Sequence, residues 1–169
     1  MEITKIIPLH KKGDKKSVRN YRPVSLLCFA GMILERVVAL QIEDYFEKNN
    51  LFGKFQFGFR RGKSTISGLL TLFDTILEAK EEKTEIILLL YDLSSAFDTV
   101  LHKILLEKLK LYGFDDLAMN WTKSFLEDRQ QIVSVDGKLS NTQNVKLGTP
   151  QGSRLSPLPI IILMADLDM

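Results

Sequence analysis

The pattern of apolar and polar residues predicts a chain made mostly of helices. Apolar residues recur every three or four positions, as they do on the buried face of a helix, in several stretches bounded by Ser, Asp, Asn or Gly. These stretches predict helices over residues 33–48, 64–82, 98–112 and 115–129. Ser156-Pro157 is a typical start for a final helix, although the β-branched run 160–162 argues against it.

Three other segments predict strands. Residues 86–91 are apolar without a break, which is typical of a strand buried on both faces. Residues 131–135 and 145–147 predict two further strands joined by a loose connection. Residues 8–23 and 51–63, which carry Gly, Pro and charged residues, predict loops. Together these elements indicate an α+β (mixed α/β) fold.

Composition and charge restrict the class of protein. The chain has 169 residues, 45% of them hydrophobic and 26% charged, which is ordinary for a folded domain. The net charge is only +2, but residues 1–22 hold seven basic and two acidic residues, a local +5, and residues 54–63 hold four basic residues and no acid. Two basic patches suit a phosphate-rich partner, and two solvated loops are the alternative.

Cysteine content and targeting signals indicate an intracellular protein, in the nucleus or the cytoplasm. The single cysteine, Cys28, lies between Leu27 and Phe29 and is expected to be a small core residue in a reducing compartment. The first residues lack the apolar stretch of a signal peptide, and the run Leu158–Ala165 is too short to span a bilayer, so we expect no membrane partner.

Two segments carry candidate chemistry. Asp92 directly follows the predicted buried strand, where a carboxylate is costly unless a group such as Mg²⁺ compensates it. The alternative is that Asp92 caps a turn, and Asp98 is expected to cap the next helix. Residues 148–153, Gly-Thr-Pro-Gln-Gly-Ser, predict a rigid turn with a close-approach surface, in which Gln151 can hydrogen-bond a base, sugar or phosphate. A plain turn before a helix is the alternative.

Four motifs in order resemble those of one enzyme family. They are NYRPVSLL (20–27), QFGFRRGKST (56–65), YDLSSAFDTV (91–100) and GTPQGSRLSP (148–157). This series resembles the reverse transcriptases of non-LTR (LINE-type, jockey-like) retrotransposons, over about residues 5–158. The resemblance implies a partial right-hand polymerase fold without a thumb, with a fingers-like region over 1–84 and a partial palm over 85–169.

The resemblance also implies an activity and a set of site residues. The activity is that of an RNA-directed DNA polymerase, which extends a DNA primer 3′-hydroxyl on an RNA template with dNTPs by two-metal phosphoryl transfer, using Mg²⁺ (or Mn²⁺). The residues, in order of role, are the catalytic and metal-binding Asp92 with the Leu93 carbonyl, the nucleotide-binding Arg22, Phe97, Gln151 and Gly152, and the nucleic-acid-binding Arg60, Arg61 and Lys63. Phe97 would exclude a 2′-hydroxyl, and a core aromatic is its alternative role.

The chain departs from the family at its end. The family's next motif, an aromatic residue followed by Ala-Asp-Asp in a strand–turn–strand, does not occur before Met169. Asp115 and Asp116 resemble it in letters only, because they lie between two predicted helices and are expected to favour the start of the second. We therefore expect the chain to be inactive alone. A non-catalytic nucleic-acid-binding fragment and a pseudogene product are the alternatives.

Overall fold

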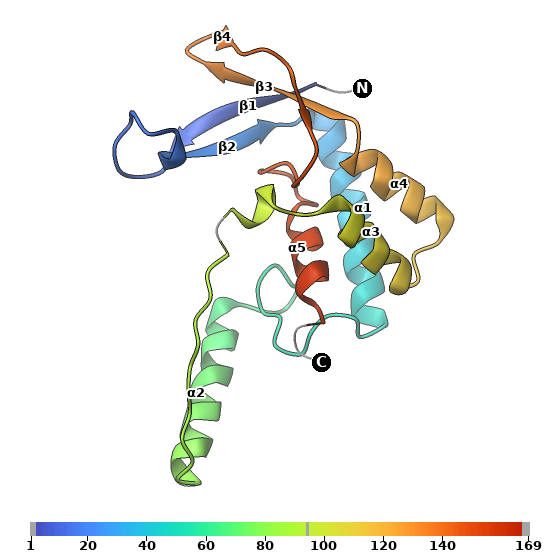
Figure 1. Ribbon diagram of the computed structural model, residues 1–169. Helices are drawn as coiled ribbons and strands as arrows, with labels where there is room; N and C mark the ends of the chain where they lie inside the picture. Colours follow the sequence, from blue (N-terminus) through green and yellow to red (C-terminus); the bar gives the residue numbers. More distant parts are fainter. Residues whose placement is uncertain (1–2, 94, 167–169) are drawn as a thin grey trace.

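The computed structural model of the protein describes residues 3–93 and 95–166. A small twisted sheet lies at one end, a cluster of helices packs beneath it, and one further helix extends away from both (Figure 1). This is a mixed α/β architecture, as the sequence predicts. Among the described helices, none combines the length and the apolar composition needed to cross a membrane.

The sheet joins segments from both ends of the chain. Its order is β2-β1-β3-β4, with β5 also pairing with β3. The β1–β3 pair is parallel, whereas β2 pairs antiparallel with β1, and β4 and β5 pair antiparallel with β3. The strands are β1 (Ile3–His10), β2 (Tyr21–Leu26), β3 (Arg129–Val135), β4 (Lys138–Leu139) and β5 (Gln143–Val145). Strands from before and after residue 84 share this sheet. The expected division into a fingers-like region and a partial palm at that residue stays a prediction.

The predicted loop over residues 8–23 is wrong at both ends. Those ends belong to the β1–β2 hairpin, in which Pro8 lies opposite Pro23. Proline cannot donate to a strand ladder, so two prolines argue against a strand unless they fall where no amide is needed. The basic tip that we expected lies between the strands, and it contains a short 3₁₀ helix, η1 (Val18–Asn20).

Four helices enclose the core. They are α1 (Phe29–Lys48), α3 (His102–Leu111), α4 (Asp116–Leu126) and α5 (Pro157–Met164). Phe46, Leu105, Leu109, Leu126 and Leu158 are almost completely removed from water. The final helix does form, because its β-branched residues lie in this core and burial outweighs their low helix propensity.

Helix starts are partly as predicted. The Asp115 carboxylate accepts a hydrogen bond from the Ala118 amide at 2.8 Å, which confirms that this acid starts α4. Helix α1 begins earlier than predicted, and its N-cap is Cys28, whose sulfur accepts from the Gly31 amide at 3.2 Å. Cys28 is exposed, so its prediction as a core residue is wrong. Its apolar neighbours suggested burial, but the capping position lies at the surface.

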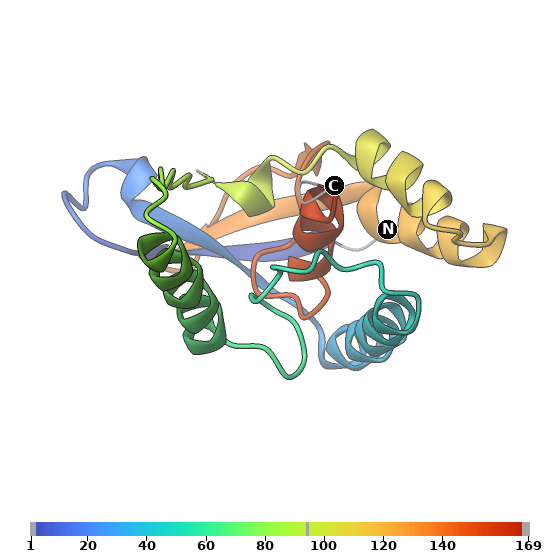
Figure 2. The same cartoon turned by 90° about the horizontal axis from the view of Figure 1, so that it is seen from below.

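Helix α2 (Thr65–Glu81) forms where predicted but does not bury its apolar face. Ser64 and Ser67 form a reciprocal capping box at its start. The residues expected to point inward, such as Leu69, Leu70 and Phe73, are 54%, 59% and 59% exposed. Figures 1 and 2 show the reason: α2 stands apart from the helical cluster, and the segment that follows it runs alongside.

The predicted buried strand over residues 86–91 is not observed. The segment is extended, pairs with no strand among the described residues, and runs back beside α2. Its six side chains are between 43% and 86% exposed. A strand buried on both faces needs neighbours along its edges and layers above and below. The part of the chain that the structure describes supplies neither.

Candidate functional site

The candidate site is built around residues 148–153, here called the Gln151 turn, which connects β5 to α5. The backbone amides of Gly148 and Thr149 donate to the carbonyls of Val100 and Phe97, at 2.9 and 2.7 Å. On its other side, the Gln151 carbonyl accepts from the Ser25 amide at 2.8 Å. The turn is therefore fastened both to β2 and to the motif that contains Phe97.

Gly148 permits this close approach. Its φ is +78°, a left-handed conformation that favours glycine, and a Cβ at this position would lie 2.6 Å from the Phe97 carbonyl oxygen. Both observations agree with the prediction of a rigid turn with a close-approach surface.

Gln151 is hydrogen-bonded to Asp98. The Gln151 side-chain Nε2 donates to both Asp98 carboxylate oxygens, at 2.9 and 3.1 Å. Asp98 ends a 3₁₀ helix, η2 (Ala96–Asp98), whereas α3 begins at His102 with Leu101 as its N-cap and no side-chain capping bond. The prediction that Asp98 caps this helix is therefore wrong. The carboxylate lies against the glutamine of another motif instead.

Two buried polar side chains support the turn from behind. Ser153 Oγ donates to the Glu35 carboxylate at 2.5 Å, and both side chains are at most 7% exposed. His102 Nε2 lies 2.8 Å from the Gly148 carbonyl oxygen. Because a carbonyl only accepts, this nitrogen must carry the hydrogen, which sets the tautomer. Each end of the turn is thus held by a side chain from a helix.

Arg129 adds a partly buried charge to this support. Burial lowers the pKa of Arg129, and the negative charge of Glu35 opposes that shift. Sequence reasoning missed Glu35, His102 and Arg129. The available signal was the place of Glu35 on the same helical face as Ala39 and Phe46, where an acid needs a specific partner.

A cavity of about 470 Å³ opens beside the turn. Its walls include Pro23, Asp98, Arg129, Thr149 and Gln151. The Thr149 hydroxyl and Arg129 Nη1 are buried and have no hydrogen-bond partner among the described residues. Buried polar atoms normally have partners, and these two lie in the wall of the cavity with almost no surface open to solvent.

The predicted nucleotide-binding residues lie at different distances from this cavity. Gln151 lines it, and Phe97 is half-buried in η2 with its carbonyl bonded to the turn. Gly152 is exposed on the opposite side of the turn, where it lines another cavity. Arg22 is exposed on β2 and is not among the residues that line the cavity, although its neighbour Pro23 is. The roles of these residues stay predictions.

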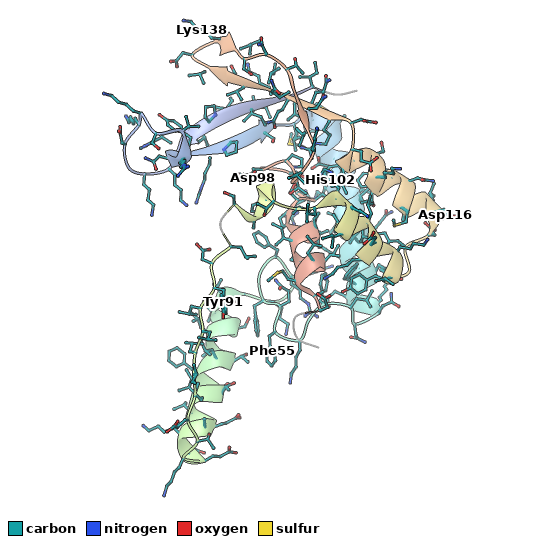
Figure 3. All side chains as sticks on the ribbon, in the orientation of Figure 1. Phe55, Tyr91, Asp98, His102, Asp116 and Lys138 are labelled. Atoms are coloured by element: carbon teal, nitrogen blue, oxygen red, sulfur yellow. The ribbon has the colours of Figure 1, made fainter. Side chains whose placement is uncertain are left out.

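Asp92 does not lie at the end of a buried strand, and its position beside the Gln151 turn is not observed. It is exposed, as is Leu93, and it lines none of the cavities described for the structure. Figure 3 shows the preceding residue, Tyr91, beside α2 and apart from Asp98. Across residues 3–93 and 95–166 there is no group of three or more His, Cys, Asp or Glu that could hold a metal ion. The described residues therefore do not by themselves fit a divalent cation.

The predicted nucleic-acid contacts lie in residues 54–63, here called the basic loop. Arg60 Nε and Nη2 donate to the two Glu47 carboxylate oxygens at 2.7 and 2.8 Å, and the role of Arg60 in nucleic-acid binding stays a prediction. These hydrogen bonds lower the pKa of Glu47 and raise the pKa of Arg60. Arg60 Nη1 also donates to the Gly53 carbonyl, so Arg60 braces the loop. Arg61 and Lys63 are exposed.

Comparison with known proteins gives the family. Residues 9–169 match the family described as reverse transcriptase (RNA-dependent DNA polymerase). The chain is 36% identical over 163 residues to a probable RNA-directed DNA polymerase from transposon BS of Drosophila melanogaster. It is 37% identical over 163 residues to the RNA-directed DNA polymerase from mobile element jockey of the same species. In both cases the alignment covers 96% of this chain and 18% of the relative.

A more distant relative also comes from a transposable element. A retrovirus-related Pol polyprotein from the type-1 retrotransposable element R2 of Popillia japonica is 29% identical over 156 residues, which is 91% of this chain and 21% of that protein. The chain thus spans about a fifth of the length of the curated relatives that it matches. The family match extends over nearly all of its residues, and the chain belongs to the reverse transcriptase family.

Proposed function

We propose that this chain is the nucleotide-pocket part of an RNA-directed DNA polymerase, which extends a DNA primer on an RNA template with dNTPs. The observation that carries the proposal is the hydrogen bond between Gln151 and Asp98. It joins two motifs more than fifty residues apart at the wall of one polar cavity. A pocket that must recognise a sugar and a triphosphate needs such fixed polar groups.

The residues have separate roles in this proposal. Gln151 and the backbone of Gly152 line the nucleotide pocket, and the Phe97 ring excludes a 2′-hydroxyl by steric conflict. Arg22 contacts the triphosphate through its planar guanidinium, which can form two charge-assisted bonds to phosphate oxygens. The support for the role of Phe97 is that the Gln151 turn fixes its backbone.

The metal ion is not placed by this proposal. Reverse transcriptase domains use a divalent cation, and Asp92 with the Leu93 carbonyl are our candidates among these residues for binding Mg²⁺ or Mn²⁺. The described residues do not form that site alone. We therefore propose that the chain alone does not extend a primer, and that the reaction requires a longer polymerase.

A segment exchange tests the proposed function. The aligned 163 residues of the jockey polymerase are replaced by the corresponding residues of this chain, and extension of a DNA primer on an RNA template is measured. We expect activity well above that of the same chimera with Asp92→Ala. A chimera that is folded and soluble but no more active than its Asp92→Ala form would contradict the proposal.

A non-catalytic nucleic-acid-binding role is the second candidate, favoured by the exposed position of Asp92 and the basic loop. It predicts that the isolated chain binds RNA equally well with and without Asp92→Ala. It also predicts an inactive chimera. Primer extension by the isolated chain above background would contradict our expectation that it is inactive alone.

A further inference from the structure

A second cavity, here called the Phe59 cleft, lies on the other side of the Gln151 turn. It has a volume of about 890 Å³ and is lined by the basic loop, by the start of α5 and by α1. Figures 1 and 2 both show the loop passing beside α5. Gly152 lines the Phe59 cleft, whereas its neighbour Gln151 lines the cavity with Asp98. Two adjacent residues of the turn thus line two different cavities.

The cleft holds an excess of positive charge. Arg61, Lys63 and Arg154 line it and are exposed, and the one acid that lines it is Glu43. Within residues 3–93 and 95–166, neither Arg61 nor Arg154 forms a salt bridge. The fourth cation, Arg60, is neutralised by Glu47. Three cations that line one cleft suit a row of phosphates.

An exposed aromatic ring lies in the same cleft. Phe59 is 68% exposed, and its φ of +53° is a left-handed conformation that a bulky residue rarely adopts. Arg60 holds the loop in this shape through Glu47 and the Gly53 carbonyl. A single exposed phenylalanine is ordinary. A strained and exposed one among cations is the arrangement of a stacking platform for single-stranded nucleic acid.

We propose that the Phe59 cleft binds a single-stranded polynucleotide, with one base stacked on Phe59 and phosphates at Arg61, Lys63 and Arg154. The proposal adds Phe59 and Arg154 to the expected contacts and assigns Arg60 to bracing the loop. Its role in templating rests on the proposed function. The strand would pass Gly152, one residue from the glutamine in the other cavity.

Binding to the isolated chain tests this site directly. Fluorescence anisotropy is measured with labelled 12-nucleotide oligo(U) RNA, oligo(dT) DNA and a 12-base-pair duplex, over a series of salt concentrations. Arg154→Ala should weaken single-strand binding several-fold and reduce the log–log salt slope by about 0.7. Phe59→Ala should weaken it about 5- to 100-fold and leave that slope unchanged, because stacking is not a counterion effect. Phe59→Tyr should restore the affinity.

Lys138→Ala provides the matched control. Lys138 is exposed at the tip of the β3–β4 hairpin, away from the basic loop (Figure 3). The Lys138→Ala substitution removes one positive charge, as Arg154→Ala does, and should change the affinity for single strands less than two-fold. Equal losses for the two variants, no effect of Phe59→Ala in a variant whose circular dichroism and thermal melting match the parent chain, or tighter binding of the duplex would overturn the proposal.

The two nucleic-acid probes and the segment exchange give separate outcomes. Equal binding of RNA and DNA assigns the cleft to any single strand, and preference for either one assigns it to that strand. Loss of binding in Phe59→Ala together with an inactive chimera would contradict the proposed polymerase function and support the proposed binding site in the Phe59 cleft. An active chimera without binding of single strands by the isolated chain would support the polymerase function and contradict the binding site in the Phe59 cleft.

Discussion

Gln151 and Asp98 are joined by a side-chain hydrogen bond across 53 residues of sequence. The carboxylate has two acceptor oxygens within 3.1 Å of the Gln151 Nε2, so it fixes the direction of the amide. The Gln151 carbonyl oxygen of the side chain then faces away from Asp98, since an acceptor gains nothing from a carboxylate. A ligand in the neighbouring cavity would meet a glutamine with a set orientation.

Removing the Asp98 carboxylate should release Gln151. We expect Asp98→Ala to shift and narrow the Gln151 side-chain amide signals in ¹H–¹⁵N spectra. The free energy of unfolding should fall by less than about 1 kcal/mol, because Asp98 is exposed. Asp98→Asn retains one acceptor oxygen and should leave the signals close to those of the parent chain. Gln151→Leu assigns the signals. Unchanged Gln151 signals in Asp98→Ala would show that the bond does not hold the side chain in solution.

The helices were the part of the fold that the sequence predicted best. Periodicity and local capping residues located α2 and α4, because both signals depend on neighbours within a few residues. The β1–β2 hairpin was not predicted, because Pro8 and Pro23 each argue against a strand and the sequence does not show that they lie opposite one another. Burial was also misjudged: residues 86–91 are apolar, but burial depends on partners that periodicity does not reveal.

In the candidate site too, local features were predicted and contacts between distant residues were not. The motif pattern located Gln151 and the close approach at Gly148, because a turn of this kind has a local signature. It did not reveal which acid meets Gln151. Asp92 and Asp98 are six residues apart, and only the tertiary fold selects Asp98. Glu35 was missed for the same reason, since its partner Ser153 lies 118 residues away.

Gly148 should tolerate no side chain. Gly148→Ala places a Cβ 2.6 Å from the Phe97 oxygen and 2.8 Å from the Asp98 Cα, and both are backbone atoms that cannot move alone. We expect the free energy of unfolding to fall by roughly 2–4 kcal/mol in urea titrations. The control is Gly137→Ala, which has a similar φ of +77° and no heavy atom within 4 Å. It should cost about 1 kcal/mol. Equal losses in the two variants would mean that the close approach is absent.

Glu35 and Arg129 should be energetically coupled. Burial disfavours the charge on Arg129 and the negative charge of Glu35 opposes that effect, so either change alone removes one charge of an interacting pair. We expect Glu35→Gln and Arg129→Gln each to lower the free energy of unfolding by roughly 1–3 kcal/mol, and the double variant to lose at least about 1 kcal/mol less than their sum. Ser153→Ala measures separately the contribution of the hydrogen bond from the Ser153 hydroxyl to Glu35, which Glu35→Gln also perturbs. Additive effects in the double-mutant cycle would rule out the coupling.

The pair of Glu47 and Arg60 should make the stability of the chain depend on pH on the acid side. Arg60 lowers the pKa of Glu47 below its ordinary value of about 4.5, so the folded state favours the ionised carboxylate. That contribution is complete above the unfolded-state pKa and is lost as pH falls through the lower, folded-state pKa. Urea unfolding at pH 7 should show the parent chain more stable than Glu47→Gln by up to about 1 kcal/mol, a small value because the Glu47 side chain is partly exposed to solvent.

That difference between the parent chain and Glu47→Gln should shrink steadily as pH falls below the ordinary carboxyl value. The raised pKa of Arg60 acts only in strongly alkaline solution and does not enter this range. Glu107→Gln is the control, because Glu107 pairs with Lys103 at 4.0 Å between two well-exposed side chains and should contribute almost nothing. A Glu47→Gln difference that persists undiminished at pH 3 would show that packing of the basic loop, and not the charge on the carboxylate, is what the substitution removes.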